Sequence, residues 1–131
     1  MLPVPPARSP NKMSYTHHFS QQQPYVVDGG SDKIIDSITF PIASKFSVAL
    51  VTVQPGAMRE IHWHVDSDEW SFFISGNARI TVFSDASRTF CFAEGDVGYV
   101  LFPDTHNIEN TGDVNIVYLE ALLAPKVTGK F

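Results

Sequence analysis

Short apolar segments separated by turn residues make up most of this sequence. In residues 78–83 (ARITVF) every second residue is apolar, as in an antiparallel strand with one buried face. Residues 47–53 (SVALVTV) and 115–123 (NIVYLEALL) are apolar on both faces, which predicts strands in the middle of a sheet. No stretch has the period of a long helix.

Turn residues recur after residue 54, at a regular interval from residue 75 onward. The breaks are QPG, SGN, SDAS, EGD, FPD and TGD, at 54–56, 75–77, 84–87, 94–96, 102–104 and 111–113. A spacing of roughly 8 to 12 residues is typical of a β-sandwich or barrel. We therefore predict an all-β domain over 15–124. A proline-rich arm over 1–14 precedes it and lies on a surface or a partner, and a short tail over 125–131 follows.

Composition and charge narrow the class of protein. A chain of 131 residues with 44% hydrophobic and 18% charged residues is typical of a single globular domain. The formal net charge is -5 without a basic cluster, which argues against a nucleic-acid partner. The apolar runs are too short to span a membrane. One cysteine, Cys91, and a start without an apolar signal-peptide core favour a reducing, cytoplasmic setting.

Residues 55–76 (PGAMREIHWHVDSDEWSFFISG) have the pattern of a β-hairpin and carry two histidines at alternate positions. In an extended strand His62 and His64 project to one face and Trp63 to the other. Glu69 follows in the same segment, and His106 comes after a distant turn.

This set of side chains has the chemistry of a metal site. Three imidazoles and one carboxylate suit a divalent ion such as Mn, Fe, Ni, Cu or Zn. On an octahedral ion they leave two positions open for substrate or oxygen. The alternative is that His62 and His64 are ordinary strand residues and that His106 caps a turn.

Two motifs in the sequence resemble those of the cupin superfamily. The first motif is matched by Gly56, His62, His64, Glu69 and Gly76, and residues 95–110 (GDVGYVLFPDTHNIEN) resemble the second, with His106 in the ligand position. The segments PGAMREIHWH, EGDVGYV and IENTGD further resemble the C-terminal cupin domain of the two-domain oxalate decarboxylases. The resemblance implies a double-stranded β-helix, or jelly roll, with manganese held in its interior by His62, His64, Glu69 and His106.

The resemblance also implies roles for Arg59 and Glu120. In those enzymes an arginine three residues before the first ligand histidine steadies the carboxylate of bound oxalate, and Arg59 has that position. Glu120 matches an acid on the last barrel strand, where its apolar neighbours would favour a carboxyl group able to take or give a proton. The alternatives are an Arg59 at the rim, paired with a surface acid, and a buried Glu120 that only forms a salt bridge with Arg59.

Two departures from the family pattern leave the reaction open. Leu101 stands where the family has proline, and proline appears at Pro103, so the loop over 101–105 is expected to take a different path. The first cupin domain of the family, with its lid segment, has no counterpart in this sequence. One hypothesis is an enzyme that decarboxylates or oxidises oxalate or a similar small carboxylic acid, with O2 as a further reactant. The others are a cupin dioxygenase or isomerase of another substrate, and a non-catalytic binder of metal or carboxylate.

A single cupin domain is expected to keep the apolar face that meets the other domain in the two-domain relatives. Residues 33–40 (KIIDSITF) and the outer side of 47–53 are the candidates for this face. Large apolar patches mark interfaces, and a twofold homodimer is the commonest closed assembly. We therefore predict a homodimer in which the arm before Asn11 lies across the neighbour. The alternative is a monomer whose arm folds over its own sheet.

Overall fold

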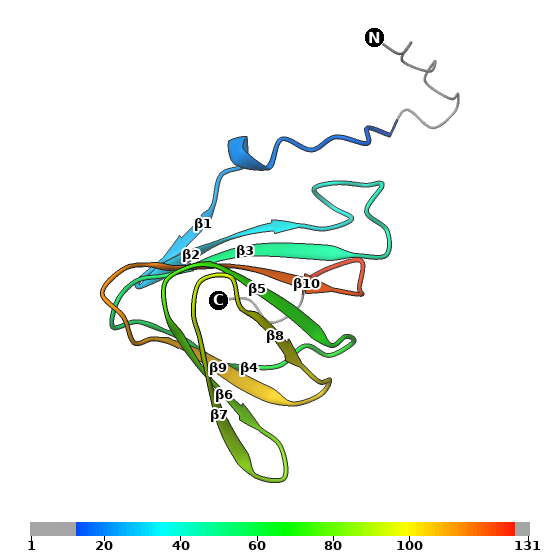
Figure 1. Cartoon of the computed structure of the whole chain (residues 1–131). Coiled ribbons are helices and arrows are strands. Elements are labelled where there is room, and N and C mark those ends of the chain that lie inside the picture. Colours follow the sequence, from blue (N-terminus) through cyan, green and yellow to red (C-terminus); the bar gives the residue numbers. More distant parts are fainter. Residues whose placement is uncertain (1–12, 128–131) are drawn as a thin grey trace.

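The computed structural model describes residues 13–127, and the regular elements of this range are mainly strands (Figure 1). The strands are β1 (Tyr25–Val27), β2 (Gly30–Ile35), β3 (Ser47–Val53), β4 (Met58–His62), β5 (Glu69–Ser75), β6 (Ala78–Phe83), β7 (Ser87–Phe92), β8 (Val97–Val100), β9 (Thr105–Asn110) and β10 (Ile116–Leu122). Within 13–127 the one helical element is the 3-10 turn η1 (Phe19–Gln21), and no helix is long and apolar enough to cross a membrane. The all-β prediction is confirmed. Residues 1–12 of the predicted arm and 128–131 of the predicted tail lie outside the described residues.

The strands form two antiparallel sheets. The larger has the order β1-β2-β3-β10-β5-β8 and the smaller the order β4-β9-β6-β7. β3 and β10 pair with each other and each has a second neighbour, which is the central position that their apolar pattern predicts. Along both strands buried side chains that face the interior alternate with half-buried ones on the outer face.

The segment 55–76 is not a β-hairpin, so this sequence-based prediction is wrong. β4 pairs with β9 in the smaller sheet, whereas β5 pairs with β10 and β8 in the larger one. The chain therefore crosses between the sheets over residues 63–68. Alternation of apolar and polar residues specifies a strand but not its partner. The outer face of β5 is apolar and carries Trp70, Phe72 and Ile74, which suits a place between two strands of the larger sheet.

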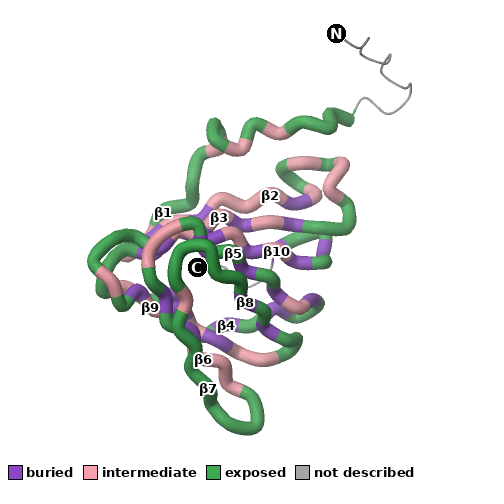
Figure 2. Tube along the Cα trace, viewed as in Figure 1, coloured by how far each residue is buried: buried purple, intermediate pink, exposed green. Residues whose placement is uncertain are grey.

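The two sheets enclose one core of apolar side chains. Its buried members are Ala49, Val51, Val53, Phe73, Ala78, Ile80, Ile108, Ile116 and Tyr118. Figure 2 shows buried stretches along the strands of both sheets, whereas the β7 side of the β6–β7 hairpin is exposed. The turn after β5 requires glycine, because Gly76 has a φ of 82° and a Cβ there would lie 2.6 Å from the Asn115 carbonyl oxygen.

Candidate metal centre

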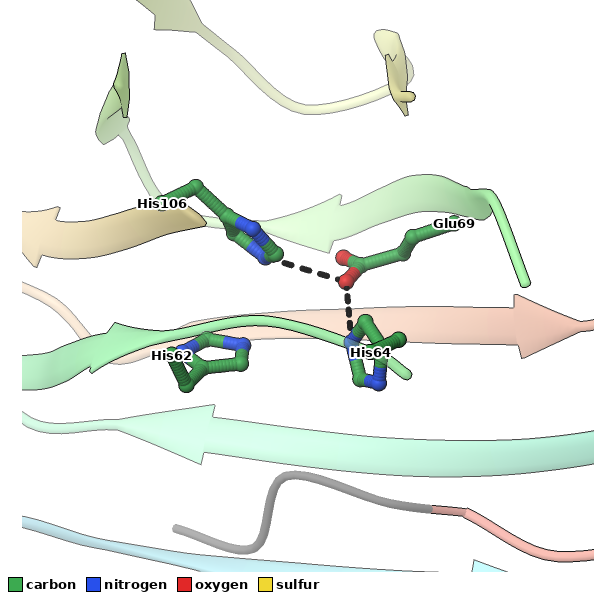
Figure 3. Close-up of side chains that lie close together, drawn as sticks. All are labelled: His62, His64, Glu69 and His106. Atoms are coloured by element: carbon green, nitrogen blue, oxygen red, sulfur yellow. Dashed lines mark hydrogen bonds and ion pairs between the residues drawn. The ribbon is translucent and has the colours of Figure 1, made fainter. Parts of the chain in front are cut away.

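Three histidines and one glutamate converge in the interior (Figure 3). His62 ends β4, His64 lies two residues further along the chain, Glu69 begins β5, and His106 is the second residue of β9. Each side chain offers one ligand atom, and these atoms lie within 4.8 Å of one another. All four residues are at most 9% exposed, while Trp63 is 51% exposed. The two alternate histidines thus point inward and the tryptophan outward, as predicted.

The spacing of the ligand atoms suits a six-coordinate ion. Glu69 Oε2 lies 2.7 Å from His64 Nε2 and 3.0 Å from His106 Nε2. With metal–ligand bonds of about 2.1 Å, two ligand atoms at right angles about an ion lie about 3.0 Å apart. These side chains therefore already have nearly the separation that neighbouring ligands need.

Hydrogen bonds to the remaining polar atoms orient two of the ligands. The Nδ1–H group of His62 donates to the Glu60 carbonyl at 2.8 Å, and its buried Nε2 has no hydrogen-bond partner among the described residues. A buried imidazole nitrogen without a partner is costly, and a metal ion would supply one. The Ser71 hydroxyl donates to Glu69 Oε1 at 2.8 Å, while Oε2 faces the histidines. The sequence analysis missed Ser71, although its place two residues after Glu69 on the same strand face could have revealed it.

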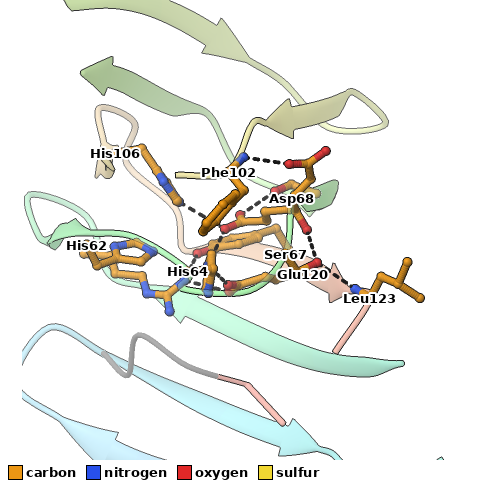
Figure 4. Close-up of polar contacts among 12 residues, drawn as sticks. His62, His64, Ser67, Asp68, Phe102, His106, Glu120 and Leu123 are labelled. Carbon is orange, nitrogen blue, oxygen red and sulfur yellow. Dashed lines mark hydrogen bonds and ion pairs between the residues drawn. The ribbon is translucent and has the colours of Figure 1, made fainter. Parts of the chain in front are cut away.

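Arg59 and Glu120 form an ion pair beside the histidine cluster. Arg59 Nη1 lies 2.7 Å from Glu120 Oε2, and the side chains are 2% and 0% exposed. The alternative of a rim arginine is therefore wrong, and the salt bridge named in the alternative for Glu120 is present. Glu120 Oε1 lies 2.7 Å from His64 Nε2 (Figure 4). Arg59 Nη1 also donates to the Tyr118 hydroxyl at 3.1 Å, a residue that the sequence analysis did not single out.

Burial and nearby charges set the protonation of this cluster. Burial and the positive charge of Arg59 lower the pKa of His62 to about 3, so this ring is neutral at pH 7. Burial alone would also lower the pKa of His64, but hydrogen bonds to Glu120 and Glu69 raise it to about 10. Burial would raise the pKa of Glu69, yet hydrogen bonds with His106 and His64 hold it well below its usual range. A metal ion would therefore meet a neutral His62 and an ionised Glu69, and would displace a proton from His64.

Asp68, next to the ligand glutamate, holds the loop that departs from the family pattern (Figure 4). Its Oδ1 accepts the Phe102 N–H at 2.6 Å, and its Oδ2 accepts the Tyr99 hydroxyl at 2.5 Å. The loop closes as a turn in which the Asp104 N–H donates to the Leu101 carbonyl at 2.9 Å. This carboxylate thus ties the segment before β5 to the segment before β9.

At the sequence level, this chain is similar to a cupin family model and to oxalate decarboxylases. A family model described as cupin matches residues 17–122. Oxalate decarboxylase OxdC of Bacillus subtilis is 49% identical over 108 residues, which cover 81% of this chain and 28% of that protein. An oxalate decarboxylase of Arthroderma benhamiae is 46% identical over 121 residues, with 87% and 28% covered. This chain thus spans less than a third of the length of either relative.

Solved structures agree with the sequence matches. A structure of Bacillus subtilis oxalate decarboxylase at pH 4.6 superposes with a TM-score of 0.87 at 44% identity, over 90% of this chain and 31% of that one. A second structure of this enzyme, from work on its Mn(II) centres, gives a TM-score of 0.89 at 41% identity over 98% and 34%. The formate complex of Lactobacillus farciminis oxalate decarboxylase gives 0.86 at 39% identity over 90% and 36%.

Proposed function

Because this chain belongs to the cupin family, we propose that it binds a divalent metal ion, manganese in the first place, through His62, His64, Glu69 and His106. The observation that carries this proposal is the convergence of four buried ligand atoms within 4.8 Å. Manganese is favoured because a solved relative of 41% identity is described by its Mn(II) centres. The donor set itself also suits Fe, Ni, Cu and Zn.

Metal analysis of protein purified without added metal tests this site directly. His62→Ala is expected to abolish tight binding of the ion while the β-rich circular dichroism spectrum stays unchanged. His18→Ala is the matched control, because His18 is exposed and lies outside the cluster. Full metal occupancy in His62→Ala would refute the assignment.

The charges around the site favour a small carboxylic acid as the bound molecule. A divalent ion and Arg59 carry three positive charges against the two negative charges of Glu69 and Glu120, so the loaded interior keeps a net positive charge. A guanidinium group can bind a carboxylate through two hydrogen bonds. Oxalate is the first candidate, because the relatives at 43–49% identity are named oxalate decarboxylases.

The residues around the ion suit cleavage of the carbon–carbon bond of such an acid. A bound manganese ion would supply a Lewis acid and an acceptor of electrons. Arg59 would hold one carboxylate of the substrate. Glu120, whose Oε1 lies 2.7 Å from His64 Nε2, would take the proton of the acid or return one to the product. Burial of all these groups keeps water from the reacting atoms.

Oxalate turnover with and without O2 separates the candidate reactions. Formate and carbon dioxide in equal amounts would indicate decarboxylation, whereas carbon dioxide with hydrogen peroxide would indicate oxidation by O2. Oxalate binding without product would indicate a non-catalytic binder. No oxalate binding by the manganese-loaded protein would refute oxalate as the ligand and favour a cupin of another substrate, for which the turn over 101–104 is the structural argument.

Arg59→Lys tests the role of the guanidinium group. An ammonium group cannot reproduce the two-pronged hydrogen bond to a carboxylate, so we expect weaker oxalate binding with unchanged metal content. Arg79→Lys is the matched control, because Arg79 forms an exposed ion pair with Glu109. Equal oxalate affinity of Arg59→Lys and the unmodified protein would exclude this role.

We propose further that the chain forms a homodimer through the outer face of the larger sheet. The outward side chains of the four neighbouring strands β3, β10, β5 and β8 carry no charge: Val48, Leu50, Thr52, Val117, Leu119, Ala121, Trp70, Phe72, Ile74, Val97 and Tyr99. On β5 and β8, Trp70 is 56% exposed, Val97 53%, Tyr99 48% and Phe72 45%.

This face would fit the same face of a second copy of the chain. An uncharged apolar face is complementary to itself, as a twofold interface requires. Aromatic side chains bury about 150–250 Å² each when fully covered, so the three half-exposed ones of this face would bury roughly 200–400 Å² per copy. The other outward side chains of the face would supply the rest of a standard interface of about 800 Å² per copy. The contribution predicted for the arm before Asn11 lies outside the described residues and stays a prediction.

A further inference from the structure

Tyr118 is a member of the apolar core that carries a polar atom. Its ring is fully buried and stacks on Phe73, with ring centroids 5.4 Å apart. Its hydroxyl oxygen accepts a hydrogen bond from Arg59 Nη1 at 3.1 Å. Tyr118 stands on β10 two residues before Glu120, so both side chains enter the interior from the same strand.

Packing alone does not explain the hydroxyl group of Tyr118. A phenylalanine would fill the same place against Phe73, whereas a buried hydroxyl is costly unless it has a hydrogen-bond partner. Arg59 comes from β4 in the smaller sheet and Tyr118 from β10 in the larger one. The hydrogen bond therefore joins the two sheets directly beside the candidate metal centre.

Glu120 divides its contacts between Arg59 and His64. Its Oε2 lies 2.7 Å from Arg59 Nη1, but its Oε1 lies 2.7 Å from His64 Nε2. A carboxylate that turns toward substrate during the reaction loosens its hold on the guanidinium group. Tyr118 is fixed by ring packing, so its oxygen stays where Arg59 can reach it.

We propose that Tyr118 is a positioning residue whose phenolic oxygen holds the Arg59 guanidinium group in place independently of the Glu120 carboxylate. This inference rests on the proposed function insofar as Arg59 is the group that binds the substrate carboxylate. Its consequence is specific: the Tyr118 hydroxyl matters most for ligand binding when the ion pair is absent.

Oxalate binding to manganese-loaded protein tests this consequence by calorimetry. In a Glu120→Gln background, Tyr118→Phe is expected to raise the oxalate Kd about tenfold, which is the scale of one hydrogen bond to a charged group. Glu120→Gln alone removes a negative charge from the site and should leave dianion binding measurable. Tyr15→Phe is the matched control in the same background, because Tyr15 is 87% exposed and lies outside the cluster. A threefold change or less for Tyr118→Phe, with metal content unchanged, would overturn the inference.

A second measurement needs no substrate and separates this inference from the proposed function. In the metal-free protein of 14.5 kDa, nitrogen-15 NMR resolves the Nη groups of an arginine whose rotation about the Cζ–Nη bonds is hindered. We expect the Arg59 Nη groups to rotate faster in Glu120→Gln/Tyr118→Phe than in Glu120→Gln. Equal rotation rates in the two variants would overturn the positioning role. A failure of the unmodified protein to bind oxalate would overturn only the proposed substrate.

Discussion

Arg59→Met is expected to destabilise the metal-free protein far more than the loss of an ordinary surface arginine. The substitution leaves Glu120, which is 0% exposed, without the partner at 2.7 Å. Removing one member of a buried ion pair costs about 3–5 kcal/mol. We expect a cost at the lower end of this range, because Glu120 keeps His64 at 2.7 Å as a second partner. The Tyr118 hydroxyl also loses the donor at 3.1 Å, which adds about 1 kcal/mol.

Arg59→Met/Glu120→Leu distinguishes an unpaired buried charge from lost packing. Replacing both members of a buried pair by apolar residues of similar volume is often close to neutral. The double variant should therefore recover most of the lost stability and lie within about 2 kcal/mol of the unmodified protein. Urea unfolding at pH 7 with a chelator present, followed by circular dichroism, measures the free energies of unfolding of the unmodified protein, Arg59→Met and the double variant.

Arg79→Met is the matched control for this experiment. Arg79 and Glu109 also lie 2.7 Å apart, but their side chains are 47% and 32% exposed. An exposed pair contributes little, so this variant should not differ measurably from the unmodified protein. The reasoning would be refuted if Arg59→Met lost no more stability than Arg79→Met, or if the double variant were less stable than Arg59→Met.

Four further predictions concern the metal, the pH dependence of stability and the assembly. Since the pKa of His64 is raised to about 10, manganese binding at pH 7 should release about one proton and tighten as pH rises. Calorimetry in buffers of different ionisation enthalpy measures this release, and binding without it would contradict the prediction. The same shift stabilises the metal-free protein below the unfolded pKa of about 6.5, and that stability should be lost as pH rises toward 10 in urea unfolding. His106→Ala should lose tight metal binding yet keep its strands, as metal analysis and circular dichroism would show. Sedimentation should give twice 14.5 kDa at micromolar concentration and 14.5 kDa for Phe72→Lys, whereas a monomeric unmodified protein would exclude the dimer.

The sequence predicted those features that depend on local periodicity. The alternation in 78–83 correctly identified β6, and the apolar faces of 47–53 correctly placed β3 inside a sheet. The opposite directions of His62 and Trp63 followed from the same period of two. Strand pairing depends on residues far apart in the chain, and for this reason the hairpin predicted over 55–76 was wrong.

The sequence analysis found the charged groups of the site but not the neutral ones that orient them. A carboxylate amid apolar residues, such as Glu120, is conspicuous because burying a charge requires a partner. Tyr118 and Ser71 are compatible with a core or a strand, so composition gives no reason to single them out. Both lie two residues from an acid of the site on the same strand face, and only the folded structure shows which hydroxyl contacts which group.

The crossing of the chain between the sheets over 63–68 is what assembles the centre. His62 ends a strand of the smaller sheet and Glu69 begins a strand of the larger one, so this short connection brings ligands from both sheets to one point. In a hairpin the two residues would lie side by side in one sheet, whereas here Glu69 comes from the sheet opposite His62 and His106, which pair with each other across β4 and β9. Arg59 and Glu120 join the same two sheets through an ion pair of 2.7 Å. The metal ligands and the Arg59–Glu120 pair both require the two sheets at one fixed separation. Each set of contacts helps to keep that separation, so the two sets depend on one another for position.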